Sequence, residues 1–455
     1  MKKSIPGNAR RTPAGQAVVY GLGDMGTNFV YMLISSYTTL YFTDSVGLSA
    51  AFVGTMMLIC RFLDGGSDVL MGALIEKTHS RWGKCRPWFV VSIIPFFIGV
   101  LLLYRVPEGF SLAGKQVYSY LAYIFMTVIC YTASNLSFTA MLSRFTFDDE
   151  DRIRVNNIRM IISMLASLVA GALTLQFIDM AGGVGNPLAW KRISLIYGIV
   201  CLVLHTLCGL MLKERPESEM NEESNAHTSD SPFRESLKSV ITCKYFYLAL
   251  ALFTLFYVTV GLGNIDAYYV REVLGSNSYM TPLAATTAIV FVLFPLMSRL
   301  TKKFGKRNLC IAGSLLMTVS GIILLLKPSS LPLAIVSYLI NALGRGVFMA
   351  LILTYCSDLV DYIALKAHIR TEGFSYASYT VGSKVGTGLG GAIVGWGLAL
   401  GGYDGLLASQ SAATVKSILM LNAMSKIVIG IVLAIIIYFL RLDRAIEKEK
   451  EKQDL

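Results

Sequence analysis

Two aspartates lie four residues apart inside a long apolar stretch, residues 50–75, with Gly65 and Gly66 between them. If this stretch is a helix, Asp64 and Asp68 share one face, because residues i and i+4 lie one above the other. A charged side chain at the centre of a membrane helix costs about 2.5–3.5 kcal/mol on insertion scales. Two carboxylates kept on one face at that cost predict a use, and the chemistry they suit is holding a small monovalent cation.

A purely structural interpretation of the pair is also available. Arg61 precedes Asp64 by three residues and could neutralise it on the same helix face. That pairing leaves Asp68 unexplained, whereas the two glycines thin the helix where an ion or a partner must approach. We therefore favour a cation site over a local ion pair.

Further polar side chains fall at or near membrane depth in other apolar stretches. Each alone could serve as a helix–helix hydrogen bond or a snorkelling charge. Together they predict a central cavity that suits hydroxyl-rich solutes. These residues are Asn28, Asn135, Arg159 and Lys384. Arg345 and Lys416 have less context, and we interpret both as structural or interfacial.

The composition identifies the elements that must position these side chains. Of 455 residues, 54% are hydrophobic and 15% are charged, which excludes a soluble globular domain. A membrane helix needs about 20 apolar residues. We predict an all-α polytopic membrane protein with about 12 transmembrane helices in two six-helix bundles. The predicted spans lie near residues 14–43, 48–75, 87–104, 117–143, 157–180, 192–212, 240–270, 278–300, 308–327, 332–362, 372–402 and 415–441.

The net charge of +11 is a topology signal here rather than a sign of nucleic-acid binding. Twelve spans put both termini on one side of the membrane. Of the 40 Lys and Arg residues, 28 then fall on that side, six fall on the other and six lie within spans. By the positive-inside rule both termini are predicted to be cytoplasmic.

Polar composition also marks the domain boundaries. Residues 213–239 are rich in Glu, Ser and Asn and divide the spans six and six, so we predict bundles at 1–212 and 240–441, a cytoplasmic linker between them and a cytoplasmic tail at 442–455. A basic turn recurs between the second and third spans of each half, at residues 82–86 and 304–307. Two related six-span halves are the pattern of major facilitator transporters.

Catalytic and redox constellations are missing from the sequence. The segment Gly21–Gly26 matches the dinucleotide-binding glycine spacing, but no strand precedes it, so helix packing is the better interpretation. None of the eight cysteines falls in a predicted outside loop. The histidines are scattered and fit no catalytic motif: His79, His205, His227 and His368. The protein is therefore predicted not to be an enzyme.

Several motifs together resemble one transporter family, the glycoside–pentoside–hexuronide:cation symporters, across nearly the whole chain. The resemblance implies the major facilitator fold, a bacterial inner-membrane location and uptake of a sugar with a cation. The segments that carry it are Tyr20-Gly21-Leu22-Gly23-Asp24, Tyr41-Phe42-Thr43-Asp44, Arg61 through Asp68, Met71-Gly72, Arg81-Trp82-Gly83-Lys84-Cys85-Arg86-Pro87-Trp88, and Asp358-Leu359-Val360-Asp361-Tyr362 with Arg370 and Glu372.

The resemblance also implies residue roles at the cation site. Asp64 and Asp68 would bind the coupling cation and would be its metal ligands if that cation is Na⁺. Ser67 stands where galactoside carriers of the family have an asparagine, which leaves Na⁺, H⁺ and Li⁺ open. Residues that would assist are Thr132, Thr380 and Lys384. No other cofactor is implied.

At the sugar site the resemblance implies a changed specificity. Asn28 and Asn135 replace two aspartates that grip galactosides, Thr139 and Met349 replace aromatic partners, and Arg159 is kept. Fewer negative charges favour a pentoside or hexuronide, although asparagine also suits neutral glycosides. The remaining residues of the implied substrate site are Asp24, Tyr131 and Lys384.

We therefore predict a secondary active transporter that couples a sugar glycoside or uronide to a monovalent cation by alternating access. Its expected partners are that sugar, the cation and membrane lipid, and no nucleic acid. The rival interpretations are an uncoupled sugar facilitator, which needs neither Asp64 nor Asp68, a membrane sensor built on a transporter fold, and a membrane enzyme.

Overall fold

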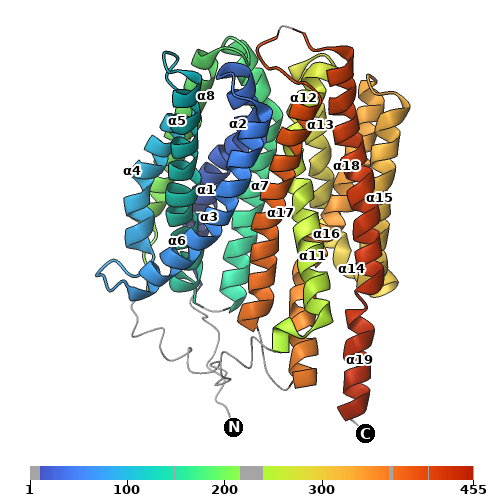
Figure 1. The fold of residues 1–455 in the computed structure, drawn as a ribbon. Helices are drawn as coiled ribbons and strands as arrows, with labels where there is room; N and C mark the ends of the chain where they lie inside the picture. Colours follow the sequence, from blue (N-terminus) through green and yellow to red (C-terminus); the bar gives the residue numbers. More distant parts are fainter. Residues whose placement is uncertain (1–10, 148, 216–238, 368–371, 408, 454–455) are drawn as a thin grey trace.

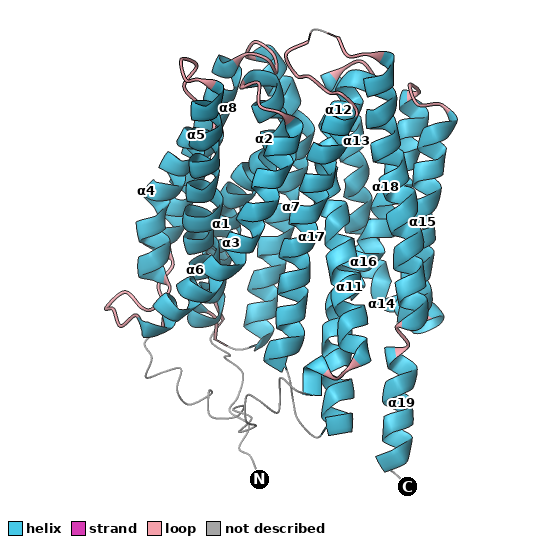
Figure 2. Cartoon of the chain, viewed as in Figure 1, coloured by secondary structure: helices cyan, strands magenta, loops and turns pink. Residues whose placement is uncertain are grey.

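The computed structural model describes residues 11–147, 149–215, 239–367, 372–407 and 409–453. All regular secondary structure in these residues is helical (Figure 2). Most of the predicted linker, residues 216–238, lies outside the described residues, as does Arg370 of the family motif.

The first half consists of six helical segments that run back and forth across the molecule. The first and fourth contain short π-helical turns. Their elements are α1 (Ala14–Met32), η1 (Leu33–Tyr37), α2 (Thr38–Leu40) and η2 (Tyr41–Ser45); α3 (Ala50–Lys77); α4 (Arg86–Leu103); α5 (Leu112–Ile124), η3 (Phe125–Cys130) and α6 (Tyr131–Phe145); α7 (Asp149–Met180); and α8 (Pro187–Met211).

The second half repeats this plan, with short 3-10 and π-helical turns in its first two segments and an additional helix after the last. Its elements are α11 (Lys244–Gly261), η5 (Leu262–Asn264), α12 (Ile265–Tyr268) and η6 (Tyr269–Val273); η7 (Asn277–Tyr279), α13 (Met280–Ala285), η8 (Thr286–Ala288) and α14 (Ile289–Phe304); α15 (Lys306–Leu326); α16 (Leu331–Ala367); α17 (Glu372–Leu400); α18 (Ala412–Phe439); and α19 (Leu442–Gln453). The prediction of about twelve spans is confirmed.

Ten of these segments are long and apolar enough to cross a membrane by length and composition. Helices α3 and α17 do not meet this criterion. They are 28 and 29 residues long, which is long enough, so the reason is that they are not apolar enough. Helix α3 carries Arg61, Asp64 and Asp68, and α17 carries Lys384 and seven glycines between residues 382 and 397. They pack on each other where the halves meet, and α7 meets α13 at the same boundary. The two helices with the least apolar composition thus meet each other at the boundary between the halves.

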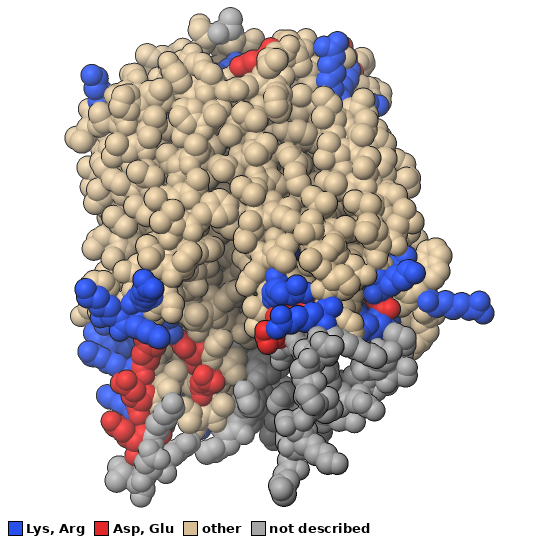
Figure 3. Space-filling view, turned by 180° about the vertical axis from the view of Figure 1, so that it is seen from behind, with Lys and Arg blue, Asp and Glu red and all other residues tan. Residues whose placement is uncertain are grey.

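The two ends of the molecule differ in charge. Helix α1 begins and α19 ends at the same end, which we call the terminal end (Figure 1). Lys and Arg side chains gather at this end on the face shown in Figure 3, and few lie at the opposite end. The broad middle of that face carries almost no charge, as expected for a surface in contact with lipid.

The two basic turns at the terminal end have structural partners. The carboxylate of Glu214, just after α8, accepts hydrogen bonds from the backbone N–H groups of Lys84 at 2.9 Å and Cys85 at 2.8 Å, at the start of α4. Burial and the nearby Glu214 charge raise the pKa of the Cys85 thiol to about 11. In the second half, Lys306 pairs with Asp358. Each turn is thus tied to its own bundle by a carboxylate.

Candidate functional site

The paired aspartates of α3 meet a cation from the other half of the protein. Lys384 of α17 lies between them, with its Nζ 2.5 Å from Asp68 Oδ2 and 3.3 Å from Asp64 Oδ2. The same ammonium donates to the Asp64 carbonyl oxygen at 3.0 Å. Three charges from two bundles therefore converge on one point at the boundary of the halves.

Hydroxyl groups complete this cluster on the side of the first half. Thr132 of α6 donates to Asp64 Oδ1 at 2.9 Å, and the hydroxyls of Ser67 and Thr132 lie 3.1 Å apart. Arg61 Nη1 lies 3.6 Å from Asp64 Oδ2. We call Asp64, Ser67, Asp68, Thr132 and Lys384 the cation cluster.

The two carboxylates of the cation cluster are held differently. The Asp64 side chain is 9% exposed and contacts a hydroxyl and two cations. The Asp68 side chain is 30% exposed. Among the described residues, its carboxylate has only Lys384 as a hydrogen-bond or ion-pair partner. Asp68 is thus the member with oxygen lone pairs to spare.

The donor set suits a hard monovalent ion or a proton. Carboxylate, hydroxyl and carbonyl oxygens are the ligands that such ions take, whereas transition metals favour nitrogen and sulfur. No group of three or more His, Cys, Asp or Glu residues converges in the described part of the chain. Thr380, one turn from Lys384, is exposed and donates to the Tyr376 carbonyl at 3.3 Å, so it is not part of the cluster in this conformation.

A second polar group joins α1 and α7 of the first half. Arg159 Nη1 lies 3.6 Å from Asp24 Oδ2, and the Ser163 hydroxyl donates to the same carboxylate. One turn further along both helices, Asn28 donates to the Asp24 carbonyl at 2.8 Å and accepts from the Ser167 hydroxyl at 2.9 Å. Asp24, Asn28 and Arg159, all predicted at the sugar site, are therefore brought together.

The two predicted sugar residues on α6 form no hydrogen bond with this group in the described residues. The Tyr131 ring packs against Tyr31, with centroids 5.8 Å apart. Asn135 is half-buried, and within the described residues it makes no hydrogen bond. The structure does not join Tyr131 or Asn135 to Asn28.

Between the halves lies a cavity of about 440 Å³, a size typical of small-molecule sites. Asn28 of the predicted sugar residues lines it. Its other polar lining residues include Tyr31, Arg61, Ser163, Ser167, Asn264, Asp266, Asn341, Arg345 and Thr387. Arg345, interpreted from the sequence as structural or interfacial, also lines this cavity. Lys416 is exposed near the start of α18.

The sequence contained a signal for the second-half residues. Asn264 and Asp266 follow directly on the Val260–Gly263 segment and interrupt the apolar stretch 240–270, just as Asp24 and Asn28 interrupt the first span. Ser163 and Ser167 gave no such signal, because serine is common in membrane helices and only the packing of α7 on α1 brings them to Asp24 and Asn28.

A family model described as MFS/sugar transport protein matches residues 19–444. The chain belongs to this sugar-transport family of the major facilitators. The prediction of a cation-coupled sugar symporter family is consistent with the relatives described next.

Three curated relatives illustrate the range of the family. The chain is 28% identical to the isoprimeverose transporter of Lactiplantibacillus pentosus, over 86% of this chain and 81% of the relative. It is 28% identical to the inner membrane symporter YicJ of Escherichia coli K12, over 89% and 87%. It is 27% identical to a glucuronide carrier protein homolog of the same organism, over 85% and 83%.

Solved structures show the same fold at much lower identity. A bacterial homolog of the human lysosomal transporter Spinster, in an inward-facing unoccupied conformation, superposes with a TM-score of 0.67 at 15% identity, covering 95% of this chain and 96% of that one. The nucleoside transporter NupG gives a TM-score of 0.61 at 11% identity, covering 93% of this chain and 99% of that one. The predicted major facilitator fold is confirmed.

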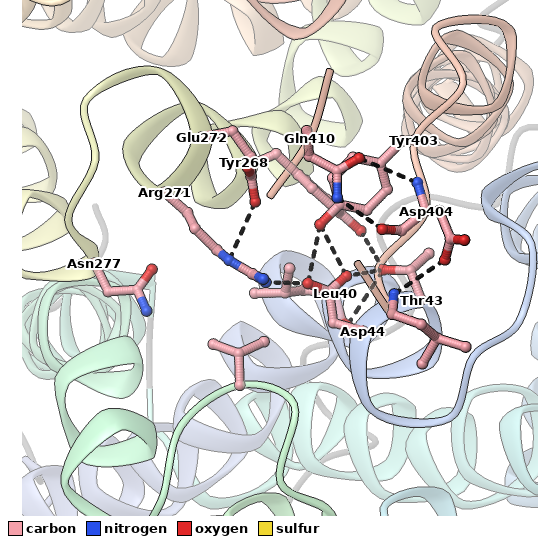
Figure 4. Close-up of polar contacts among 12 residues, drawn as sticks. Leu40, Thr43, Asp44, Tyr268, Arg271, Glu272, Asn277, Tyr403, Asp404 and Gln410 are labelled. Atoms are coloured by element: carbon pink, nitrogen blue, oxygen red, sulfur yellow. Dashed lines mark hydrogen bonds and ion pairs between the residues drawn. The ribbon is translucent and has the colours of Figure 1, made fainter. Parts of the chain in front are cut away.

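In this major facilitator a group of polar contacts joins the two halves at the end opposite the termini (Figure 1). Figure 4 shows these contacts in detail. Asp44, at the end of η2, pairs with Arg271 of η6. The Tyr403 hydroxyl, beyond α17, donates to both Asp44 oxygens at 3.0 and 2.9 Å. Thr43 bonds Asp44 at 2.7 Å and Tyr268 at 2.9 Å. We call Thr43, Asp44, Tyr268, Arg271 and Tyr403 the closure cluster.

The carboxylate of the closure cluster is fully buried, whereas the Arg271 side chain is 26% exposed. The Asp44 side chain is 0% exposed, and it accepts from Thr43, Arg271 and Tyr403. Burial, and then the Asp44 charge, raise the pKa of Tyr403, so this phenol stays a neutral donor. Removing Arg271 would leave the Asp44 charge buried without its cation, which is costly.

Close helix packing extends this contact toward the cavity. Gly395 of α17 meets Gly54 of α3, and a Cβ atom at Gly395 would collide with the Ala50 carbonyl oxygen. Trp396 donates to Thr55 at 3.0 Å across the same seam. At the α7–α13 boundary, Gln176 donates to Thr281 at 2.7 Å.

Toward the terminal end the arrangement is different. The molecule is hollowed between the halves on the face shown in Figure 3, above the residues drawn in grey. Tyr376, one turn from Thr380 on α17, is 44% exposed. The halves are therefore in contact at the end opposite the termini, through the closure cluster, and are separated by a hollow toward the terminal end.

Proposed function

We propose that this protein is a sugar:cation symporter that works by alternating access of its two halves. Family membership and the cavity between the halves support transport of a sugar. The observation that supports coupling is the position of Lys384. Its ammonium, from the second half, forms ion pairs with two carboxylates of the first half. Whatever displaces that ammonium also releases a contact between the halves.

The coupling step follows from charge. Asp64 and Asp68 already face Arg61 and Lys384, so a further cation adds a third positive charge to two negative ones. Like charges held at such distances repel strongly in a partly dry site. The entering cation therefore takes the Asp68 oxygens while Lys384 withdraws, which loosens α17 from α3.

The sugar would bind in the cavity on the polar side chains of both halves. Asn28 and Ser167 present an amide and a hydroxyl to sugar hydroxyl groups. If cation binding favours the sugar-competent state, the sugar must tighten the cation by the same factor, typically ~1–3 kcal/mol for such coupled sites.

The orientation follows from the basic end of the molecule. The side that carries most Lys and Arg is cytoplasmic by the positive-inside rule. Both termini would then be cytoplasmic in a bacterial inner membrane, the closure cluster would lie on the periplasmic side, and the structure would represent a state closed to the periplasm. Na⁺, H⁺ and Li⁺ are the candidate coupling ions, with Asp64 and Asp68 as their ligands.

Counterflow in proteoliposomes tests this function. Vesicles preloaded with an unlabelled glycoside are diluted into the labelled one, with Na⁺, with Li⁺, and at two pH values without either ion. Cation-dependent counterflow, and accumulation driven by a gradient of the same ion, are the expected results. Counterflow without any cation effect would support an uncoupled facilitator, which the buried charges of the cation cluster argue against.

A further inference from the structure

The second half contains a polar cluster that the coupling mechanism does not use. Tyr338 of α16 donates to Asp266 Oδ1 of α12 at 2.5 Å and accepts from Asn422 of α18 at 3.1 Å. Lys426 donates to Asn422 Oδ1 at 2.7 Å, and its ammonium lies 4.0 Å from the centre of the Tyr338 ring. Arg345 of α16 lies beside them. Of this group, Asp266, Tyr338 and Arg345 line the cavity between the halves.

This cluster has more positive than negative charge. Two other arginines at membrane depth each have a carboxylate close by: Arg61 lies 3.6 Å from Asp64, and Arg159 lies 3.6 Å from Asp24. Within the part of the chain that the structure describes, the Arg345 guanidinium has no hydrogen bond and no carboxylate within 4.0 Å. Arg345 and Lys426 share the single charge of Asp266, which Tyr338 already holds.

A second observation points to the same place. The Oδ1 atoms of Asn264 and Asn341 are buried, and neither has a hydrogen-bond partner in the described residues. Both residues line the cavity next to Arg345, and both are more than nine-tenths buried. Buried polar atoms are normally hydrogen-bonded. Two acceptors without partners, beside a guanidinium that makes no hydrogen bond in the described residues, indicate a ligand with donors and a negative charge.

We propose that the substrate is an acidic glycoside whose anionic group binds Arg345 while its hydroxyls bind Asn264 and Asn341. This inference rests on the proposed sugar transport function and names the substrate class. The planar guanidinium fork matches a carboxylate, as in a uronide, through two parallel hydrogen bonds. The rest of the glycoside would extend across the cavity toward Asn28 and Ser167.

Two other basic residues are poorer candidates for the anionic group. A uronide carboxylate could in principle pair with Arg159 or Lys384. Arg159 already faces Asp24, and Lys384 faces Asp64 and Asp68. Arg345 is the basic group lining the cavity that has no such partner among the described residues, so an anion binds there without breaking an existing ion pair.

Equilibrium binding to the purified full chain, in the presence of the coupling cation, tests the proposal. The probes are 4-nitrophenyl glucuronide and 4-nitrophenyl glucoside as matched α and β anomers, with a 6-sulfo-6-deoxyglucoside as a third arm. The proteins are wild type, Arg345→Gln, Arg345→Lys and the control Lys416→Gln, which removes an exposed membrane cation outside the cavity.

Wild type should bind the acidic probe at least about tenfold more tightly than its neutral match, because the guanidinium forms two charge-assisted hydrogen bonds that the neutral sugar cannot accept. Arg345→Gln should abolish this preference and change binding of the neutral probe by less than about twofold. Arg345→Lys keeps the positive charge but lacks the planar guanidinium, so it should retain part of the preference for the acidic probe. This variant tests the proposal if Arg345→Gln does not fold. A sulfonate bound as tightly as the carboxylate would assign the site to anionic sugars generally.

Two outcomes overturn the inference while sugar transport stands: neutral probes that bind wild type as well as acidic ones, and an Arg345→Gln variant that weakens both members of a pair equally, as a structural arginine would. If no glycoside binds and none shows counterflow, the proposed function fails together with the inference.

Discussion

The cation cluster and the closure cluster are built from the same parts and are held very differently. In each, a carboxylate of the first half faces a cation of the second half. The Asp44 side chain is 0% exposed and has three donors, whereas the Asp68 side chain is 30% exposed and, among the described residues, has only Lys384. The Asp44 pair, whose buried carboxylate has three donors, is suited to hold a conformation. The Asp68 pair, whose carboxylate is more exposed, is suited to exchange its cation for another.

The comparison assigns the two clusters opposite energetic tasks. Removing one partner of a buried, hydrogen-bonded pair costs about 3–5 kcal/mol, because the other charge is left uncompensated. The Lys384–Asp68 pair, whose carboxylate is 30% exposed, costs less to open, since water and ions reach it. In the proposed mechanism, the closure cluster would set the equilibrium between states, and the cation cluster would connect that equilibrium to the ion. The following variants test this division.

The largest effect is expected from Arg271→Gln, which leaves the Asp44 carboxylate buried without its cation. The closed state should lose about 3 kcal/mol or more, so the end opposite the termini, which is periplasmic in the proposed orientation, should open. A cysteine placed at Ser167 in the cavity should then react with a membrane-impermeant maleimide added from outside, at least about tenfold faster than in the parent.

The control for this variant is Lys191→Gln, which removes the pair with Glu108 at 3.1 Å at the same end of the molecule. The Glu108 side chain is 70% exposed and both residues belong to the first half, so labelling should not change. Equal labelling in Arg271→Gln and Lys191→Gln would contradict the claim that the closure cluster stabilises the closed state.

Gly395→Val should weaken the same contact through packing instead of charge. Its Cβ would collide with the Ala50 carbonyl oxygen, and overpacking of this kind costs about 1–3 kcal/mol. A higher rate of periplasmic labelling and a lower melting temperature are expected. Gly72→Ala on α3 meets nothing within 4 Å and should match the parent in both measurements. If the Gly395 variant behaved like Gly72→Ala, the close packing of α17 on α3 at Gly395 would not contribute to the closed state.

Lys384→Gln sharpens the comparison at the cation cluster. Removing the ammonium that occupies Asp68 should tighten cation binding about tenfold, because a competing like charge is gone, while accumulation of sugar is lost. Isothermal titration with the coupling cation measures the first effect, and Lys416→Gln is the control. Cation binding that weakens instead would show that Lys384 supports the ion site rather than competing for it.

The smallest effects are expected in the cavity. Asn28→Ala removes a lining amide and should weaken sugar binding roughly tenfold, since a lost hydrogen bond in a buried site costs ~1–3 kcal/mol. Asn135→Ala, whose side chain does not line the cavity, should weaken it less than about threefold. Competition binding of a labelled glycoside separates them, and the reverse order would move the sugar site toward α6.

Local sequence rules predicted the parts that depend on a single helix. Apolar stretches located the spans, and the four-residue spacing placed Asp64 and Asp68 on one face, where Lys384 now meets both. The roles of Thr132 and Lys384 came from family resemblance, and the contact with Asp64 follows only when α6 and α17 pack on α3. Their spacing along the chain carries no such information.

The second-half cluster shows where sequence reasoning ended. Asp266, Arg345 and Lys426 come from three helices more than 70 residues apart along the chain, and each alone reads as an isolated polar residue in an apolar span. Arg345 was expected to be structural for that reason. Only the packed bundle shows that it faces the cavity without a carboxylate partner in the described residues.

The most direct test of the coupling uses Asp68→Asn, which keeps the shape of the side chain and removes its charge. Labelled glycoside uptake and counterflow are measured in the same proteoliposomes, for this variant and wild type, with an imposed gradient of the coupling cation. The account predicts that wild type accumulates the sugar, and that Asp68→Asn retains cation-independent counterflow but reaches no more than the equilibrium level. Accumulation by Asp68→Asn with the ion dependence of wild type would contradict the assignment of the cation cluster.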